Sequence, residues 1–201
     1  MVVSNMKQLL IATRNSGKIR EIKEILASIP FKLLSLDDID FKEEVAETGK
    51  SFAENAILKA KTIGEKAQLL TLAEDSGLEV DALDGKPGIY SARYVNGSDL
   101  DRNNKLLEEL KGVIDDKRTA RYRCVVAIYD PATQKILTFI GESEGLITDK
   151  PIGKNGFGYD PIFYNFDLGK TNGEVTLEEK NRVSHRGKAL SEAKIFLQKL
   201  L

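Results

Sequence analysis

The chain has very little cysteine and histidine, with one residue of each among 201. Because Cys124 is the only cysteine, no disulfide can form within the chain, and this agrees with a cytoplasmic location. Cys124 opens the apolar run Cys124–Ile128, and a thiol in such a run is typical of a buried structural residue. The sequence therefore excludes an intrachain disulfide framework and disfavours a cysteine nucleophile.

Long apolar runs and an excess of charge of either sign are also missing. No run approaches the roughly 20 apolar residues needed to span a bilayer, and the first residues lack the basic-then-apolar order of a signal peptide. The 30 basic and 31 acidic residues leave a net charge of −1, which argues against broad non-specific binding to nucleic acid. An anionic ligand would need a local cluster of basic side chains.

The remaining composition is that of a globular protein, with 41% hydrophobic and 30% charged residues. A chain of 201 residues suits one domain, residues 1–201, with room for two lobes. The first strand-like pattern begins after Met6, so residues 1–6 are expected to be an N-terminal extension.

The beginning of the chain has the pattern of a β–α–β unit. Residues 8–13 and 31–36 read as strands, and residues 18–28 between them carry apolar residues at helical spacing. Pro30 marks the end of this helix. These lengths predict an α/β protein.

The rest of the chain continues the alternation of helices and strands. Ser51 with Glu54, and Ser98 with Asp101, are spaced as helix N-terminal capping pairs. The predicted elements are helices over residues 51–68 and 98–110, a strand over 69–73 ending at Glu74-Asp75, a turn-rich segment over 75–95, a hairpin of 119–129 with 135–144, a glycine-rich loop over 151–161 and a helix from Gly187.

The segment from Thr13 to Lys18 connects the end of a predicted strand to the start of a predicted helix. Backbone N–H groups at a helix start attract an anion, and Lys18 adds a full positive charge. The segment is not a Walker A loop, because it lacks the first glycine and Ile19 follows the lysine. A helix cap at Asn15 or Ser16 is the alternative interpretation.

Two adjacent acids, Glu74 and Asp75, are expected at the carboxyl end of a buried strand, where α/β sheets place ligands. Mg²⁺ prefers oxygen ligands and takes only one or two protein carboxylates beside phosphates and water. Glu47 is a candidate third acid. A solvated pair of acids is the alternative.

Aromatic and basic residues gather in the last third of the chain. An aromatic–glycine–aromatic–acid turn at Phe157–Asp160 and the sole histidine, His185, are typical of a pocket for a flat, polar heteroaromatic ligand. The basic cluster around that histidine consists of Lys180, Arg182, His185, Arg186 and Lys188. A solvated basic face with a structural histidine is the alternative.

Taken together, these motifs resemble the inosine/xanthosine triphosphate pyrophosphatase family, whose members hydrolyse non-canonical purine nucleoside triphosphates. The resemblance runs from about residue 7 to residue 200. It is carried by Thr13–Glu21, Glu47–Gly49, Phe52, Glu54–Ala56, Lys59, Asp75–Leu78, Pro87–Tyr94, Phe157–Phe163, Lys180 and Ser184–Gly187.

The resemblance implies an elongated, two-lobed α/β fold around a long mixed β-sheet, with a nucleotide cleft between the lobes, and a homodimer. It also implies Mg²⁺-dependent hydrolysis of ITP, dITP and XTP to the monophosphate and pyrophosphate. Asp75 would be the catalytic proton acceptor, and Glu47, Glu74 and Asp75 would serve the metal. The implied substrate-binding residues are Thr13, Arg14, Asn15, Ser16, Gly17, Lys18, Lys59, Ser76, Phe157, Gly158, Tyr159, Asp160, Lys180, His185 and Arg186.

Two other functions remain open from the sequence. The first is a house-cleaning pyrophosphatase for other modified nucleotides. The second is a nucleotide sensor that binds without turnover, although a sensor has no need of both Glu47 and Asp75.

Overall fold

The amino-terminal part of the chain forms the predicted parallel β–α–β unit. In the computed structural model, which describes residues 6–200, β1 (Gln8–Ile11) pairs in parallel with β2 (Lys32–Ser35), and α1 (Ser16–Ile25) connects them. Leu9, Leu10 and Ile11 are fully buried, as expected for a strand that lies between two others, β2 and β3. The predicted extension, residues 1–6, lies outside the described residues except for Met6, which is exposed.

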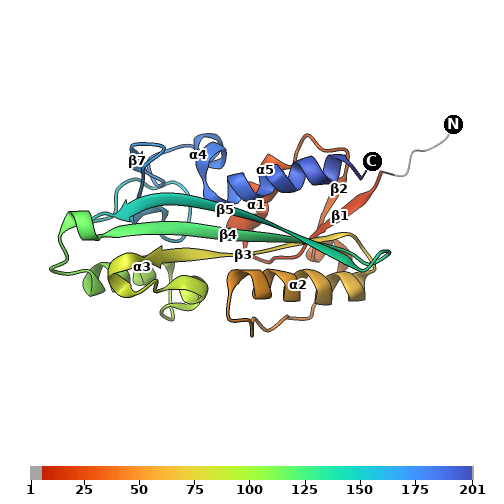
Figure 1. Cartoon of the computed structure of the whole chain (residues 1–201), viewed down its shortest axis with the longest axis horizontal. Helices are drawn as coiled ribbons and strands as arrows, with labels where there is room; N and C mark the ends of the chain where they lie inside the picture. The colour runs from red at the N-terminus through yellow and green to blue at the C-terminus, as the bar shows by residue number, and fades with distance from the viewer. Residues whose placement is uncertain (1–5, 201) are drawn as a thin grey trace. The chain divides into compact units, whose positions relative to one another are not determined.

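The described residues form a seven-stranded sheet in the order β2-β1-β3-β4-β5-β6-β7. Figure 1 shows its long strands β3, β4 and β5 side by side. The sheet is mixed, because β1 is parallel to β2 and β3 whereas β6 is antiparallel to β5 and β7. The α/β fold with a mixed sheet is therefore confirmed. The other strands are β3 (Thr71–Val80), β4 (Thr119–Asp130), β5 (Lys135–Ile147), β6 (Phe163–Asn165) and β7 (Lys170–Thr171).

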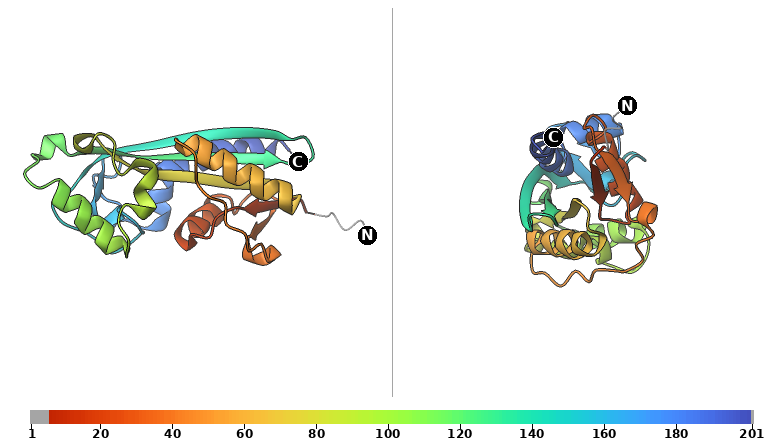
Figure 2. Two further views of the ribbon diagram at one scale, coloured as in Figure 1. Left: turned by 90° about the horizontal axis from the view of Figure 1, so that it is seen from below. Right: turned by 90° about the vertical axis from the view of Figure 1, so that its right-hand side faces the viewer.

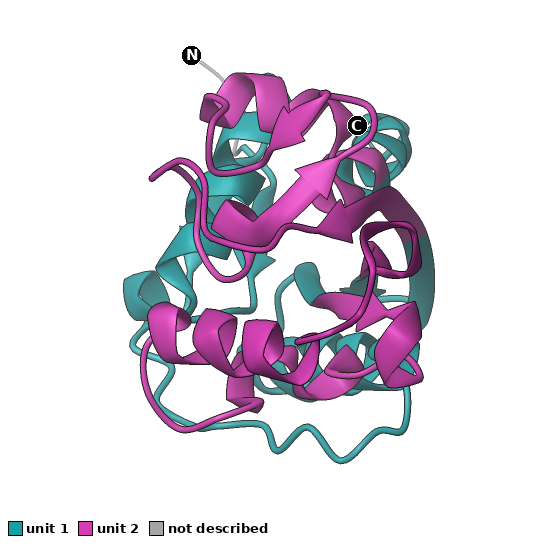
Figure 3. Ribbon diagram, turned by 90° about the vertical axis from the view of Figure 1, so that its left-hand side faces the viewer, with its two compact units in different colours: residues 1–75, 125–139, 189–201 teal, residues 76–124, 140–188 magenta. Residues whose placement is uncertain are grey.

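The chain divides into two compact units, coloured separately in Figure 3. Unit 1 comprises residues 1–75, 125–139 and 189–201, and unit 2 comprises residues 76–124 and 140–188. The boundaries fall within β3, β4 and β5 or just after the start of the last helix. The expected two lobes, the cleft and the homodimer stay predictions.

In unit 1, helices cover the sheet on both sides. Figures 1 and 2 show α2 (Phe52–Ala67) and α5 (His185–Gln198) on opposite sides of the strands. Gly64 of α2 lies so close to β3 and β4 that an added Cβ would stand 2.6 Å from Tyr129 and 3.1 Å from Thr71. On the other side, Phe196 of α5 packs on Phe139 of β5, with ring centroids 5.8 Å apart.

Unit 2 has its own hydrophobic core, to which Leu78, Leu106, Tyr122 and Phe163 belong. Its helices begin at full capping boxes, as the T/S-x-x-D/E spacing requires. Ser98 caps α3 (Asp99–Glu109) and Thr176 caps α4 (Leu177–Val183). The short 3-10 helices of the chain are Asp37–Ile39, Asp81–Leu83, Gly88–Arg93, Asp115–Lys117 and Asp160–Ile162.

Three features differ from the sequence-based expectation. The strand expected to end at Glu74-Asp75 continues to Val80, so the acids lie within β3 and not at its carboxyl end. Helix α4 and strands β6 and β7 were not predicted, because each is only two to seven residues long and leaves little periodic signal. The last helix begins at His185, two residues earlier than expected.

No helix within residues 6–200 has the length and apolar character needed to cross a membrane.

Candidate active site

The segment after β1 both caps a helix and leaves its N-terminus directed outward. Asn15 is the N-cap of α1 and its Oδ1 accepts the backbone N–H of Lys18 at 3.0 Å. The alternative interpretation of this segment as a cap is therefore confirmed, but a capped N-terminus still carries the positive end of the helix dipole. Arg14 lies aside from it, because its Nη2 donates to the carbonyl of Phe41 at 2.5 Å and its Nη1 lies 3.4 Å from Asp37.

Lys18, in the first turn of α1, pairs with a buried acid of β3. Its Nζ is 2.8 Å from Oε1 of Glu74, whose side chain is fully buried. A buried carboxylate needs such a partner, because removing an unpaired charge from water costs several kcal/mol. Glu74 therefore fixes the position of the Lys18 ammonium.

Asp75 stands next in β3 and has a different set of partners. Its Oδ2 accepts a hydrogen bond from Asn55 Nδ2 at 3.0 Å, and its Oδ1 lies 3.5 Å from Lys59 Nζ. Lys59 also donates to Oε1 of Glu47 at 2.7 Å. Because consecutive strand residues point to opposite faces, Glu74 and Asp75 do not converge on one point.

Burial gives Asp75 the electrostatic character of a base. The side chain is 7% exposed, and this burial raises the pKa of Asp75 above its ordinary value of 3.8. The ammonium groups of Lys59 and Lys18 act in the opposite direction, and the neighbouring charge of Glu47 raises the pKa further. A carboxylate with a raised pKa accepts a proton more readily than one in water.

Glu47 and Asp75 together can hold one hard cation. Oxygens of both side chains meet at the Lys59 ammonium, so the donor set already surrounds a positive charge. Two carboxylates suit Mg²⁺, which takes one or two from protein and completes its shell with phosphate and water. Within residues 6–200, no group of three or more His, Cys, Asp and Glu side chains is placed to hold a metal ion. The expected metal role of Glu74 stays a prediction.

In unit 2, the carboxylate of Asp160 organises the aromatic turn. Its Oδ2 accepts the backbone N–H of Phe157 at 2.8 Å and the ammonium of Lys180 at 2.5 Å. Gly158 takes a φ of +63°, which only glycine adopts without strain, and its N–H donates to Asp99 Oδ2 at 2.7 Å. Tyr159 is buried and its hydroxyl donates to the carbonyl of Ser91 at 3.0 Å. Tyr159 is therefore part of the hydrophobic core of unit 2.

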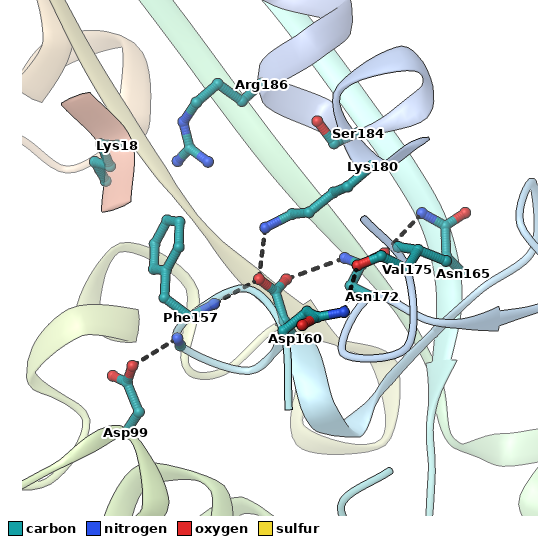
Figure 4. Close-up of polar contacts among 12 residues, drawn as sticks. Lys18, Asp99, Phe157, Asp160, Asn165, Asn172, Val175, Lys180, Ser184 and Arg186 are labelled. Carbon is teal, nitrogen blue, oxygen red and sulfur yellow. Dashed lines mark hydrogen bonds and ion pairs between the residues drawn. The ribbon is translucent and has the colours of Figure 1, made fainter. Parts of the chain in front are cut away.

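Two cations face the ring of Phe157, as Figure 4 shows. Lys180 Nζ lies 4.8 Å and the guanidinium carbon of Arg186 lies 5.6 Å from the ring centroid. Arg186 also donates through Nη2 to Ser76 Oγ at 2.9 Å. These side chains present an aromatic face and hydrogen-bond donors together, as a purine base requires.

The basic cluster predicted from the sequence separates into two kinds of residue. Lys180, His185 and Arg186 are 2–3% exposed, whereas Arg182 and Lys188 lie on the surface and pair with Glu178 and Asp167 respectively. The ring of His185 stacks on Tyr122, with centroids 4.5 Å apart and planes 6° apart. His185 is thus held inside unit 2, and its contact with substrate stays a prediction.

Sequence reasoning missed several buried polar residues that support these side chains. Asn55 holds Asp75, Asn172 donates to Asp160 and Asn165 donates to Asn172. A sequence signal existed for Asn55 alone, because it lies in the segment Glu54–Ala56 that carries the family resemblance; in the structure it is fully buried. Nothing in the local pattern marks Asn165 or Asn172.

Comparison with known proteins identifies similar sequences and a similar solved structure. The sequence model of the Ham1 family matches residues 9–196. A dITP/XTP pyrophosphatase from Geobacter sulfurreducens is 52% identical over 194 residues, with 96% of this chain and 97% of the relative covered. One of the same name from Bacillus subtilis is 46% identical over 195 residues, covering 96% and 98%. The solved structure of a HAM1 protein from Coxiella burnetii superposes with a TM-score of 0.86 at 38% identity, covering 96% of this chain and all of the other.

Proposed function

The chain belongs to the Ham1 family, and from this premise we propose that it hydrolyses non-canonical purine nucleoside triphosphates to the monophosphate and pyrophosphate. ITP, dITP and XTP are the proposed substrates, since the two relatives compared above are named dITP/XTP pyrophosphatases. The observation that carries the proposal is the environment of Asp75. This buried carboxylate has a raised pKa and is accompanied by Lys18 and Lys59.

We assign the polyphosphate to residues of unit 1. The helix N-terminus after Asn15 and the ammonium groups of Lys18 and Lys59 supply positive charge where phosphate oxygens carry negative charge. Mg²⁺ held by Glu47 and Asp75 would neutralise charge that develops on the phosphate oxygens. If the metal took the place of the Lys59 ammonium beside Glu47 and Asp75, Lys59 would be left to interact with phosphate.

The proposed reaction is attack of water on the α-phosphorus. Asp75 accepts a proton from the water as its oxygen bonds to phosphorus. The bond from the α-phosphorus to the α–β bridging oxygen breaks, and pyrophosphate leaves with the electron pair. Lys18 and Lys59 stabilise the charge that builds up on the leaving group.

We assign the base to residues of unit 2. Phe157 stacks on the purine, and Arg186 or Lys180 donates to the oxygen at C6 of hypoxanthine or xanthine. Adenine carries an amino group at that position, and a buried donor left unpaired costs about 1–3 kcal/mol. Ser76 follows Asp75 directly in β3, so one strand carries the proton acceptor and a partner of Arg186.

A substrate panel tests this function. Release of pyrophosphate from ITP, dITP, XTP, GTP, ATP and dTTP is measured with and without Mg²⁺, and the nucleotide product is identified by chromatography. We expect Mg²⁺-dependent formation of IMP, dIMP and XMP at rates well above those for the other three. Faster hydrolysis of dTTP would instead indicate a pyrophosphatase for other nucleotides, and binding of ITP without turnover would indicate a sensor.

A further inference from the structure

A line of buried polar side chains in unit 2 leads from the sheet to Asp160. Ser143 of β5, Asn165 of β6 and Asn172 after β7 are each no more than 1% exposed. Asn165 Nδ2 donates both to Ser143 Oγ and to Asn172 Oδ1 at 3.1 Å. Asn172 Nδ2 in turn donates to Asp160 Oδ1 at 3.1 Å, as Figure 4 shows. Buried polar groups are costly unless every member is satisfied, so such a line requires an explanation.

The hydrogen bonds in this line can point in one direction only. Asn165 Oδ1 accepts the backbone N–H of Asp167 at 3.0 Å, and this bond fixes which end of the Asn165 amide faces Asn172. Asn172 must then present its oxygen to Asn165 and its N–H to Asp160. The backbone N–H of Asp167, two residues after the end of β6, therefore determines that a donor faces the Asp160 carboxylate.

The Asn172 amide donates to the carboxylate oxygen of Asp160 that accepts no hydrogen bond from Phe157 or Lys180. Phe157 N–H and Lys180 Nζ both donate to Oδ2, whereas Asn172 donates to Oδ1. The terminal torsion of an aspartate is soft, so donors on one oxygen alone do not fix the carboxylate plane. The third hydrogen bond fixes it, and with it the placement of the Lys180 ammonium 4.8 Å from the Phe157 ring centroid.

We propose that Asn172 is a positioning residue for recognition of the purine base. It acts through Asp160 on Lys180 and Phe157 without contacting the substrate, and Asn165 sets its orientation. This inference rests on the proposed function, because it assigns the base to Phe157 and Lys180. It does not involve the residues of unit 1 that are assigned to the polyphosphate.

The test separates binding of the base from binding of the phosphates. Titration calorimetry measures the affinity of the folded full-length chain for IMP and for inorganic tripolyphosphate. Asn172→Asp keeps the size of the residue and its acceptor toward Asn165, but it places an acceptor against Asp160. Asn172→Ser removes the amide without adding charge. Asn103→Asp is the matched control, because Asn103 is 3% exposed in α3 and its Oδ1 has no hydrogen-bond partner among residues 6–200.

We expect Asn172→Asp to weaken IMP binding by about 10- to 100-fold, the effect of losing a hydrogen bond to a charged group. Asn172→Ser should weaken it by about 5-fold or more. The affinity for tripolyphosphate should stay within about twofold of wild type in both variants, because a substitution in one site has little effect on the binding free energy of an independent site. Asn103→Asp should leave the affinities for both ligands unchanged.

Equal weakening of both ligands, no weakening of IMP binding, or the same selective loss in Asn103→Asp would overturn the inference. If Asn172→Asp does not fold, Asn172→Ser decides, and loss of folding in both variants would show a structural role instead. A wild-type chain that fails to bind IMP would contradict the proposed function itself. Unchanged IMP binding in the Asn172 variants contradicts only the role of Asn172.

Discussion

Replacement of Asp75 by asparagine removes the proposed proton acceptor with little change in shape. In the wild-type chain, Asp75 Oδ2 accepts from Asn55 Nδ2 at 3.0 Å, and Asn55 Oδ1 is occupied by the N–H of Gly49 at 2.8 Å. The new amide must therefore turn its oxygen toward Asn55, and its nitrogen toward Lys59. Lys59 keeps its 2.7 Å contact with Glu47, so no ammonium is left unpaired.

The expected loss of rate follows from the role of a general base. Such a group contributes about 10²- to 10⁴-fold, or about 3–5.5 kcal/mol of transition-state stabilisation. We expect kcat for ITP to fall by that factor in Asp75→Asn. The assay is steady-state release of pyrophosphate at saturating ITP and Mg²⁺.

Stability should change in the opposite direction to activity. Burial raises the pKa of Asp75, so the folded state binds this proton more tightly than the unfolded state does. The charged form therefore costs stability, a cost that is absent below the unfolded pKa and complete above the raised folded pKa. Asp75→Asn should gain in Tm relative to wild type as pH rises through this window.

Two results would refute this reasoning. Turnover of Asp75→Asn within about fivefold of wild type would remove Asp75 from proton transfer. A Tm difference that moves against the variant as pH rises would show that the pKa of Asp75 is lowered by its lysines and not raised by burial.

Three further changes test the site and its supports. Asn55→Asp places a second carboxylate beside Asp75, and the like charge should raise the pKa of Asp75. The acid limb of the pH profile of kcat/KM should therefore move to higher pH, and an unchanged limb would show that Asp75 does not control it. Thr176→Ala removes the cap of α4 and should lower the free energy of unfolding in urea by about 1 kcal/mol, and no loss would contradict the capping role. Gly156→Ala should destabilise more than Gly158→Ala in the same urea experiment, because both have positive φ but only the Cβ added at Gly156 would meet a side-chain oxygen, at 2.1 Å; equal losses would mean that backbone strain alone decides.

Local patterns in the sequence were sufficient to predict much of the fold. The parallel unit of β1 and β2, the capped helices α2 and α3, and the hairpin of β4 and β5 were all predicted close to their observed bounds. Each has a clear apolar period or a capping pair that acts over a few residues. Helix α4 also has such a pair, Thr176 with Glu179, but only seven helical residues follow it.

The extent of β3 could not be predicted in this way, because its polar side chains form ion pairs and hydrogen bonds with residues that are distant in the sequence. Glu74, Asp75, Ser76 and Gly77 have the composition of a turn. They continue a buried strand because Lys18 neutralises Glu74 and Asn55 hydrogen-bonds Asp75. These partners come from helices α1 and α2, which no local window includes.

The candidate site shows the same division between chemistry and support. The residues that carry charge or an aromatic face, such as Lys18, Asp75, Phe157 and Lys180, were proposed from the motifs. The neutral amides that orient them, Asn55 and Asn172, were given no role in the site, since an asparagine has no chemical signature before its neighbours are known. Their roles follow from burial and from the direction of their hydrogen bonds.

In the proposed reaction, water attacks the α-phosphorus of a non-canonical purine triphosphate beside Asp75. Single-turnover hydrolysis of ITP in ¹⁸O-labelled water, followed by mass spectrometry of the products, tests it most directly. We expect one labelled oxygen in IMP and none in pyrophosphate. Label in pyrophosphate, or formation of IDP and labelled inorganic phosphate, would contradict it.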